Sequence, residues 1–324
     1  MLQSAGMAAE PSRYASEVFL RASLRHTGHH DITYLPERLE LLNSGTMNPK
    51  GEMELLSDNP VFSRWDGHGA LGEYCCGYML YRTMEKAKTF GVALGTVRHS
   101  NHFLAGHPYG QIAAERNCMA LIWSNTDPCM GDPEGEARVI GNNPLGFGAP
   151  DGSNPLVLDL CMAYASLGNL ATYAAEGQSI PPWWGRDGEG NFTGDPAKVL
   201  KDGITLPVGR HKGFGFALMA ELLTGGLSGG EMGQQIVPVR GWQKHSQTVL
   251  VIDLEQTGAL EDWQKRIQAM REEMSAKLGH PVRFPGDHLY REASLDRRAL
   301  HIPEETYEKL RDYSLSRGLS VPAR

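Results

Sequence analysis

The chain has 324 residues, enough to bury a sizeable core in one elaborate domain or in two modest ones. Hydrophobic residues make up 41% of it and charged residues 21%, and this balance, with 38 glycines, is typical of a loop-rich globular protein and excludes a disordered or fibrous chain. The formal net charge of -7, without a basic run, argues against nucleic acid or an anionic membrane as the main partner, so we expect a small-molecule ligand.

Helical patterns dominate the N-terminal part. Residues 14–26 carry apolar side chains near helical spacing and predict an amphipathic helix. A second helix is expected at 36–45, where Pro36 suits the first turn and Gly45 can provide the left-handed stop. A third helix is predicted over 70–90.

After residue 91 the pattern changes to that of strands joined by tight loops. Between 91 and 160, short apolar runs alternate with clusters of Gly, Asn, Pro and Asp. The density of glycine and proline predicts a loop at 181–196. In contrast, 211–230 predicts a helix that is apolar on nearly every side and is therefore expected to be buried. The other expected elements are a strand at 248–255 and helices at 260–278 and from 299 onward.

The cysteines and the N-terminal residues predict a cytoplasmic protein. The five cysteines are scattered and form no Cys-x-x-Cys pair, which argues against both a disulfide framework and a zinc site. The first residues lack the charged and apolar regions of a signal peptide, and no run approaches about 18 apolar residues. We therefore expect reduced thiols and no membrane segment.

Signatures of the common nucleotide-binding folds are missing from the sequence. GFGAPDG at 146–152 has proline where a phosphate-binding helix should begin, and GFGFAL at 213–218 lies inside a predicted helix, so neither is a Rossmann fingerprint. The sequence also contains no P-loop and no Gly-x-Ser-x-Gly nucleophile elbow. A nucleotide would therefore need a different scaffold.

Two histidine-rich segments are candidate sites, GHHDITYLPER at 28–38 and VRHSNHFLAGHPYG at 97–110. The second follows a predicted strand, and loops held by rigid elements often direct polar side chains into a cleft; a solvated loop is the alternative. Adjacent side chains diverge, so His29 and His30 do not suit a common metal ion, and we expect no metal site. Acid–base chemistry and an ordinary surface both remain open for the first segment.

Six segments of the chain occur in the order and approximate spacing of one known family. On these segments, which extend from about residue 15 to 295, the sequence resembles the malate/L-lactate dehydrogenase family of NAD(P)-dependent oxidoreductases, which lacks the Rossmann fold. Its members include sulfolactate and ureidoglycolate dehydrogenases, diketogulonate reductase and cyclic-imine (piperideine or pyrroline carboxylate) reductases. The segments are 28–49, 95–117, 123–130, 141–163, 209–229 and 282–287.

The resemblance implies an α+β fold with a central, largely antiparallel sheet. Residues 71–287 would form the NAD(P)-binding domain, and the two chain ends, 1–70 and 288–324, would together form a helical substrate domain. It also implies a homodimer of interlocked subunits, with the active site near the subunit interface, and either NAD or NADP as the cofactor.

The resemblance further implies that His30 is the catalytic histidine. His30 would protonate the substrate oxygen or imine nitrogen while the nicotinamide delivers hydride, and would act as the base in the reverse direction. Histidine suits this task because its ordinary pKa lies near working pH. His102 and Asp127 match positions that line the catalytic pocket, where Asp127 could orient a histidine or accept from the substrate, and Asn101 matches a substrate-binding loop.

Four residues near His30 depart from the family pattern. His29 and Asp31 replace a serine and a glycine. Tyr34 stands where the family has the arginine expected to grip the substrate carboxylate, and Arg38 stands where it has a tyrosine. Since about one helical turn separates them, we expect Arg38 to bind the carboxylate with Tyr34 as a hydrogen-bond partner. The alternative is a surface Arg38 and a substrate that needs no arginine.

The resemblance also assigns cofactor contacts. A helix that begins at a glycine beside Arg210 and Lys212 is physically suited to a pyrophosphate. Within DLCMA at 159–163, the family's Asp-Met-Ala-Thr-Ser is altered and two hydroxyls are lost. The assigned residues are Asp159, Leu160, Cys161, Met162, Ala163, Trp184, Gly185, Lys212, Gly213, Gly286 and Asp287.

We therefore expect an NAD(P)-dependent oxidoreductase that acts at C2 of a small 2-oxo or 2-hydroxy acid. A cyclic-imine carboxylate reductase using the same site is one alternative. A family member that has lost catalysis and binds a ligand is another, which the changes at Tyr34 and in DLCMA would allow. The sequence leaves open the substrate and the choice between NAD and NADP.

Overall fold

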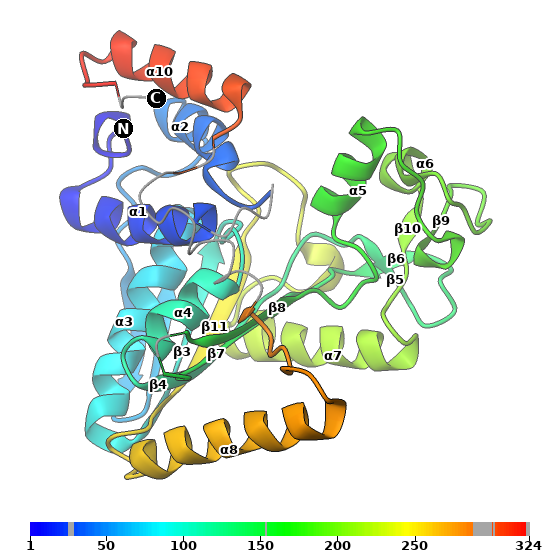
Figure 1. The fold of residues 1–324 in the computed structure, drawn as a ribbon. Helices are drawn as coiled ribbons and strands as arrows, with labels where there is room; N and C mark the ends of the chain where they lie inside the picture. Colours follow the sequence, from blue (N-terminus) through cyan, green and yellow to red (C-terminus); the bar gives the residue numbers. More distant parts are fainter. Residues whose placement is uncertain (25–28, 153, 288–299, 301, 322–324) are drawn as a thin grey trace.

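The computed structural model describes residues 1–24, 29–152, 154–287, 300 and 302–321 (Figure 1). Its centre is a seven-stranded sheet in the order β1-β2-β3-β11-β4-β7-β8. β2 and β3 run parallel and the other neighbouring pairs of this sheet are antiparallel, so the predicted α+β fold around a largely antiparallel sheet is confirmed. The strands are β1 (Glu54–Asn59), β2 (Phe62–Asp66), β3 (Val92–Ser100), β4 (Cys118–Ser124), β7 (Leu145–Ala149), β8 (Leu156–Leu160) and β11 (His245–Asp253).

Strand β11 lies in the middle of the sheet, between β3 and β4. Its Val249 is fully buried in the main hydrophobic core, whereas the neighbouring Thr248 donates its hydroxyl to the carbonyl of Leu223 at 2.7 Å. Side chains alternate between the two faces of a strand, so both faces of β11 are covered. The strand predicted at 248–255 is confirmed, although it begins at His245 because that residue pairs with β3.

The helices predicted from the sequence are present. They are α1 (Ala9–Ser23), α2 (Leu35–Asn43), α3 (Gly72–Phe90), α8 (Leu260–Leu278) and α10 (Glu304–Ser316). Pro36 lies in the first turn of α2, and Gly45 beyond its end takes a φ of 74°, as expected for the stop. Residues 25 and 26, predicted as the end of the first helix, lie outside the described residues.

The two ends of the chain pack together. Figure 1 shows α1, α2, α10 and the N-terminus at one end of the molecule, beyond α3 and α4. The hydroxyl of Tyr313 lies 3.3 Å from the hydroxyl of Ser4 and accepts from the amide of Asn43 at 3.3 Å. Leu310 of α10 is buried in the same hydrophobic core as Leu39 of α2. The C-terminal helix therefore supports the helix that carries one of the predicted substrate residues.

A smaller lobe stands beside the central sheet (Figure 1). It contains a four-stranded sheet in the order β6-β5-β10-β9 and the short helices α5 and α6. Its elements are β5 (Met130–Gly131), β6 (Arg138–Ile140), α5 (Leu167–Ala175), β9 (Gly185–Arg186), α6 (Pro196–Lys201) and β10 (Ile204–Thr205).

Two segments differ from the prediction. α4 (His107–Ala114) forms where strands and loops were expected; Pro108 suits its first turn, and the helix is buried against β4 and β7. The segment 181–196 is mostly loop, but it includes β9, which forms because β10 lies beside it. Both elements depend on contacts with distant parts of the chain, which local patterns do not reveal.

The helix predicted at 211–230 is present as α7 (His211–Glu221), followed by a π-helical turn, η4 (Leu222–Gly226). This helix was expected to be buried, which is wrong for the single chain. The rest of the chain covers only one side of the helix, where Ala217 and Ala220 are buried. The apolar side chains that are 36% to 55% exposed are Phe216, Leu218, Met219 and Leu222. None of the helices in the described ranges is long and apolar enough to cross a membrane.

Candidate active site

The two histidine-rich segments meet in the structure. The ring centroid of His30 lies 5.1 Å from that of His102 and 5.4 Å from that of Tyr34. The rings of Tyr34 and His102 are nearly parallel, with centroids 6.3 Å apart. The ring of His29 packs on His30 at 4.7 Å. One aromatic cluster thus unites predicted catalytic and substrate residues from distant parts of the sequence.

The turn that carries His30 has an uncommon backbone conformation. His30 takes a φ of 57°, in the left-handed region that residues with a side chain rarely adopt. The carboxylate of Asp31 accepts from the backbone N–H and the hydroxyl of Thr33 at 2.9 and 2.7 Å, which stabilises the following 3-10 turn. A Cβ on Gly168 of α5 would lie 3.6 Å from Nε2 of His30, so α5 closely approaches the ring. Asp31 and Gly168 together fix the position of His30.

His30 is an uncharged imidazole at neutral pH, with one ring nitrogen free of a proton. Burial lowers its pKa to about 3, since a charged imidazole loses hydration, and the neighbouring His29 lowers it further. The carboxylate of Asp159 acts in the opposite direction and raises the pKa of His30. His30 is therefore able to accept a proton, and each negative charge placed beside it makes the protonated form more stable.

His102 is a neutral hydrogen-bond donor. The backbone N–H of Leu104 donates to its Nδ1 at 3.1 Å, so the single proton of the neutral ring resides on Nε2. Burial holds the pKa of His102 well below its usual value, and the positive charge of Arg38 lowers it further. Leu104 is buried and takes a φ of 76°, a strained conformation that directs its N–H toward the histidine.

Asp159, one of the predicted cofactor residues, contacts α4. Its Oδ2 lies 3.2 Å from the backbone nitrogen and 2.8 Å from Nδ1 of His107. Although burial opposes ionisation, the hydrogen bonds from His107 keep the pKa of Asp159 below its usual value. The charge of Asp159 acts on His30, so this residue belongs electrostatically to the histidine cluster.

Asp127 is paired with a histidine that the sequence analysis did not identify. Its Oδ1 lies 3.0 Å from Nε2 of His245, and its Oδ2 accepts from the side-chain amide of Gln243 at 3.2 Å. The ring of His245 is 1% exposed and lies 6.3 Å from the ring of His102. Gln243 stands just before β11 and His245 at its start, and polar residues at the end of a buried strand are the signal that could have found them.

Asn101 lies beneath the cluster and is fully buried. Its amide donates to the carbonyls of Gly69 and Ala70 at 3.0 and 2.9 Å, and its oxygen accepts from the backbone N–H of Gln243 at 3.1 Å. These contacts tie the loop of His102 to two other segments. A direct contact between Asn101 and the substrate stays a prediction.

Arg38 is buried rather than on the surface, with 4% of the residue exposed. Its Nε donates to Glu73 of α3 at 3.2 Å and its Nη1 to Glu37 at 3.3 Å, while its Cζ lies 5.6 Å from the centre of the Tyr34 ring. Nη2 of Arg38 and Oε2 of Glu73 have no hydrogen-bond partner among the described residues. Burial raises the pKa of Glu73, and the charge of Arg38 opposes this effect. Glu73 was not predicted, because a glutamate in the first turn of a helix is usually a surface residue.

Backbone contacts join three of the predicted cofactor segments. Val208 donates to the carbonyl of Met162 at 2.9 Å, and Leu206 donates to the carbonyl of Trp184 at 2.9 Å. Gly213 fits against the first of these segments, since a Cβ there would lie 2.6 Å from the carbonyl oxygen of Met162. Residues 159–163, 184–185 and 212–213 are therefore parts of one region.

The exposed groups of this region fit a dinucleotide. Leu160, at the end of the edge strand β8, is 36% exposed, and Cys161 is partly exposed. Arg210 and Lys212 are exposed at the start of α7, and no side chain caps that helix end. The backbone N–H groups of residues 212–214 already donate to backbone carbonyls, so the two exposed cations are the groups that suit a diphosphate. Met162 and Ala163 are buried and can offer only their backbones, which agrees with the missing hydroxyls.

Gly286 and Asp287 lie near the beginning of β8. Gly286 takes a φ of 95°, and a Cβ there would lie 3.2 Å from the backbone nitrogen and oxygen of Val157. Asp287 is bound by Arg271 of α8 at 2.7 Å. The structure therefore gives both residues structural contacts, and their contact with the cofactor stays a prediction.

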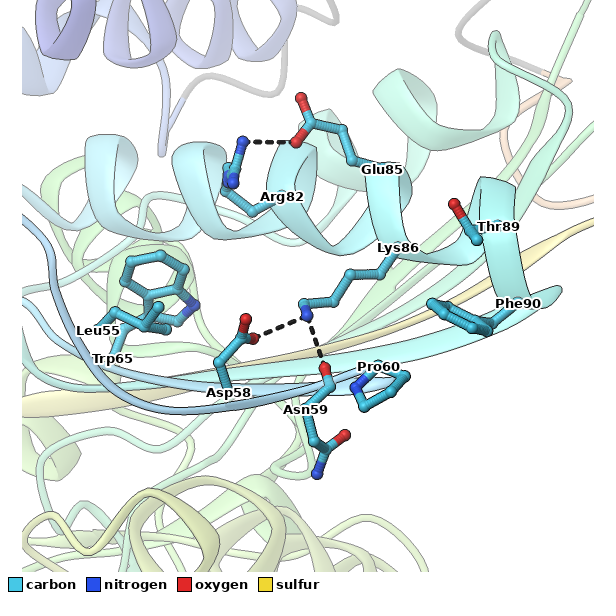
Figure 2. A pocket seen from close by; sticks show the side chains of 10 residues that line it. All are labelled: Leu55, Asp58, Asn59, Pro60, Trp65, Arg82, Glu85, Lys86, Thr89 and Phe90. Atoms are coloured by element: carbon cyan, nitrogen blue, oxygen red, sulfur yellow. Dashed lines mark hydrogen bonds and ion pairs between the residues drawn. The ribbon is translucent and has the colours of Figure 1, made fainter.

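A separate hollow lies between α3 and the β1–β2 hairpin, and Figure 2 shows its side chains. Its cations are already paired: Lys86 binds Asp58 at 2.7 Å, and Arg82 binds Glu85 at 2.6 Å. No predicted site residue lines it. Across the residues that the structure describes, no group of three or more His, Cys, Asp or Glu side chains could hold a metal ion.

Comparisons with known proteins agree with this geometry. The family model described as malate/L-lactate dehydrogenase matches residues 1–311. Malate dehydrogenase of Pyrococcus horikoshii is 29% identical over 292 residues, which cover 87% of this chain and 80% of that protein. Two solved structures superimpose on nearly the whole chain. Sulfolactate dehydrogenase of Methanocaldococcus jannaschii has a TM-score of 0.87 at 25% identity, covering 99% of this chain and 94% of its own. Δ1-Piperideine-2-carboxylate reductase of Pseudomonas syringae has a TM-score of 0.84 at 28% identity, covering 96% and 95%.

Proposed function

Since this chain belongs to the malate/L-lactate dehydrogenase family and is an oxidoreductase, we propose that it transfers hydride between the nicotinamide of NAD or NADP and C2 of a small 2-oxo or 2-hydroxy acid. The observation that supports this most is the cluster of His30, His102 and Tyr34, in which one imidazole can accept a proton and the other can donate a hydrogen bond. The bound cofactor supplies the hydride chemistry, and the protein orients the reactants and moves the proton.

His30 exchanges the proton of the substrate oxygen. In oxidation, the unprotonated ring accepts the hydroxyl proton as C2 loses hydride. In reduction the ring must first be protonated, and both Asp159 and a bound substrate carboxylate favour this because negative charge raises its pKa. Nε2–H of His102 donates to the same oxygen and stabilises the negative charge that develops on it.

Arg38 binds the substrate carboxylate. Its free Nη2 is the atom available for this contact, and the charge-assisted bond is strong because the guanidinium is buried. Tyr34 lies between Arg38 and the histidines and contributes its hydroxyl. This arrangement places the carboxylate on the Arg38 side and C2 next to His30.

The segment after β8 and the start of α7 would hold the cofactor. Arg210 and Lys212 would bind its diphosphate, Gly213 would let the backbones approach, and residues 159–163, Trp184 and Gly185 would line the rest of the site. Either NAD or NADP is compatible with these contacts.

A cyclic-imine carboxylate is the second candidate substrate, favoured by the likeness to the piperideine carboxylate reductase. His30 would then give its proton to the imine nitrogen, and Arg38 would bind the carboxylate as before. A chain that only binds a ligand is less favoured, because His30, His102 and the Asp127–His245 pair form a complete set of proton-transfer and orienting groups.

We also propose that the protein is a cytoplasmic homodimer. The support for the dimer is the group of exposed apolar side chains on α7 and η4, namely Phe216, Leu218 and Leu222. Single-chain exposure on this scale is unusual for a helix that is apolar on nearly every side.

Turnover of NADH and NADPH, measured by absorbance with a panel of small 2-oxo acids, 2-hydroxy acids and cyclic-imine carboxylates, tests the proposal. We expect one class to be turned over, and His30→Gln to reduce kcat/KM by about 100- to 10,000-fold. Binding of NAD(P)H without turnover of any member would contradict the proposal and support a ligand-binding protein. Wild-type activity in His30→Gln would contradict the role of His30.

A further inference from the structure

Glu221 is a buried carboxylate that neither the sequence patterns nor the proposed chemistry explains. It is 2% exposed and ends α7, where the π-helical turn η4 begins. Its Oε1 accepts from the side-chain amide of Asn125 and from the backbone N–H of Gly233, both at 3.0 Å, and its Oε2 accepts from the amide of Asn143 at 2.7 Å. No lysine or arginine pairs with it in the described part of the chain.

The first of these contacts leads to His245. The oxygen of the Asn125 side chain accepts from the backbone N–H of Ser246 at 2.7 Å, and Ser246 directly follows His245. The Asn125 amide also donates to the carbonyl of Glu231 at 3.0 Å. Because Glu221 offers only acceptors, the amide nitrogen of Asn125 must face it and the oxygen must face Ser246.

The second contact leads to Asp127. The oxygen of Asn143 accepts from the backbone N–H of Thr126 at 3.0 Å, and Thr126 directly precedes Asp127. The Asn143 amide also donates to the carbonyl of Ala217 at 2.9 Å. Asn143 takes a φ of 28° and is fully buried, so its side chain has little freedom to turn.

The π-helical turn leaves space for this network. A Cβ on Gly225 would lie 3.0 Å from the amide nitrogen of Asn125 and 2.4 Å from the carbonyl oxygen of Glu231. π-Helical turns are often found at functional sites. Here the turn lets the end of α7 approach the loop of Asn125 closely.

We propose that Glu221 is a positioning residue for the Asp127–His245 pair: one carboxylate, through the two side chains of Asn125 and Asn143, sets the backbone on both sides of that pair. Asp127 and His245 meet at 3.0 Å only if both backbone segments are held in register. Glu221 touches neither of them and acts through the two asparagines. The proposal rests on the proposed function, because the pair lies beside His102 in the substrate site.

Glu221→Gln is the variant that tests this role, since it preserves shape but presents an amide nitrogen to groups that are themselves donors. We expect kcat/KM on the best substrate of the panel to fall by about tenfold to hundredfold, as small displacements of site residues do. When Glu221→Gln is added to the His245→Gln variant, we expect kcat/KM to fall by less than about twofold, because the Asp127–His245 pair is already broken. Equal losses in both backgrounds would overturn the proposal.

A spectroscopic measurement tests the same role without turnover and so separates it from the proposed function. In protein labelled with ¹⁵N-histidine, the ring signal of His245 is assigned from its loss in His245→Gln. We expect Glu221→Gln to shift that signal, and an unchanged signal would overturn the proposal. The matched control is Thr83→Val, which removes a buried hydroxyl that bonds the carbonyl of Met79 within α3. We expect it to leave the signal and kcat/KM unchanged.

If Glu221→Gln does not fold, Asn143→Ala removes the connection between Glu221 and Thr126, together with the bond to the carbonyl of Ala217, and leaves the Asn125 connection in place. The loss in kcat/KM that Asn143→Ala causes in the wild-type protein is then compared with the loss that it causes in the Asp127→Asn variant. A smaller loss in Asp127→Asn would support the proposal, and equal losses would overturn it.

Discussion

Asp127 and His245 are 118 residues apart in the sequence, yet Oδ1 of the first lies 3.0 Å from Nε2 of the second. The pair stands next to His102, whose ring centroid is 6.3 Å from that of His245. A carboxylate bonded to one ring nitrogen of a histidine fixes the orientation of the ring. The pair therefore forms a rigid wall beside the His30 cluster.

Replacement of Asp127 by asparagine should disturb that wall. The asparagine side chain would offer His245 a weaker, neutral partner, so we expect kcat/KM to fall by about 10- to 100-fold while the protein stays folded, as for other residues that orient site histidines. The control is Asp132→Asn, a carboxylate of the small lobe whose Oδ1 accepts from the backbone N–H of Glu136 at 2.8 Å. Equal kinetics for the two variants would contradict a role for Asp127 in the site.

The Arg38–Glu73 pair separates binding from stability. Arg38→Ala leaves the carboxyl group of Glu73 buried without its cation, and we expect the free energy of unfolding to fall by about 3 to 5 kcal/mol in urea titrations. Adding Glu73→Gln should restore part of that stability. The KM for the acid substrate should stay raised by about 10-fold or more in the double variant, because the carboxylate contact is still missing. A KM that returns to the wild-type value would refute the assignment of Arg38.

His30 makes the folded protein sensitive to acid. Its pKa is about 3 in the folded chain and has the ordinary value of 6.5 when unfolded, so between these values the unfolded chain binds a proton that the folded chain does not. The lowered pKa of His30 therefore contributes fully to the stability of the folded chain above pH 6.5, and this contribution is lost as the pH falls toward 3. We therefore expect the free energy of unfolding in urea to decrease less for His30→Gln than for the wild type when the pH falls from 7 to 5. His280→Gln, at an exposed histidine, is the control and should follow the wild type.

The exposed face of α7 predicts the assembly. Leu222 is 55% exposed in the single chain, so Leu222→Asp should not disturb folding but should convert a dimer to a monomer in sedimentation velocity. Leu278→Asp is the matched control, since Leu278 is 53% exposed at the end of α8. A wild-type protein that sediments as a monomer, or a Leu222→Asp variant that stays dimeric, would remove this support for the dimer.

Local patterns predicted the helices and the histidine segments well. Pro36, Gly45 and the spacing of apolar residues act within a few positions of each other, so they identify α2 without knowledge of the rest of the chain. His30 and His102 were identified because each lies in a recognisable segment. That their rings meet at 5.1 Å follows from the fold.

The residues that were missed have their partners far away in the sequence. Glu73 is bound by Arg38 in the buried interior, and His245 is bound by Asp127. Glu221 accepts hydrogen bonds from two asparagines that come from different loops. Each was ordinary within its own segment. α4 was missed for the same reason, because its burial comes from β4 and β7.

The contact between α2 and α10 has a consequence for synthesis of the protein. α2 has nine residues, too few to form a stable helix alone, and its Leu39 shares a hydrophobic core with Leu310 near the C-terminus. A ribosome releases α2 long before α10. The helix that carries Arg38 therefore completes its packing only after α10 has been synthesised, and until then Leu39 lacks one of its core partners.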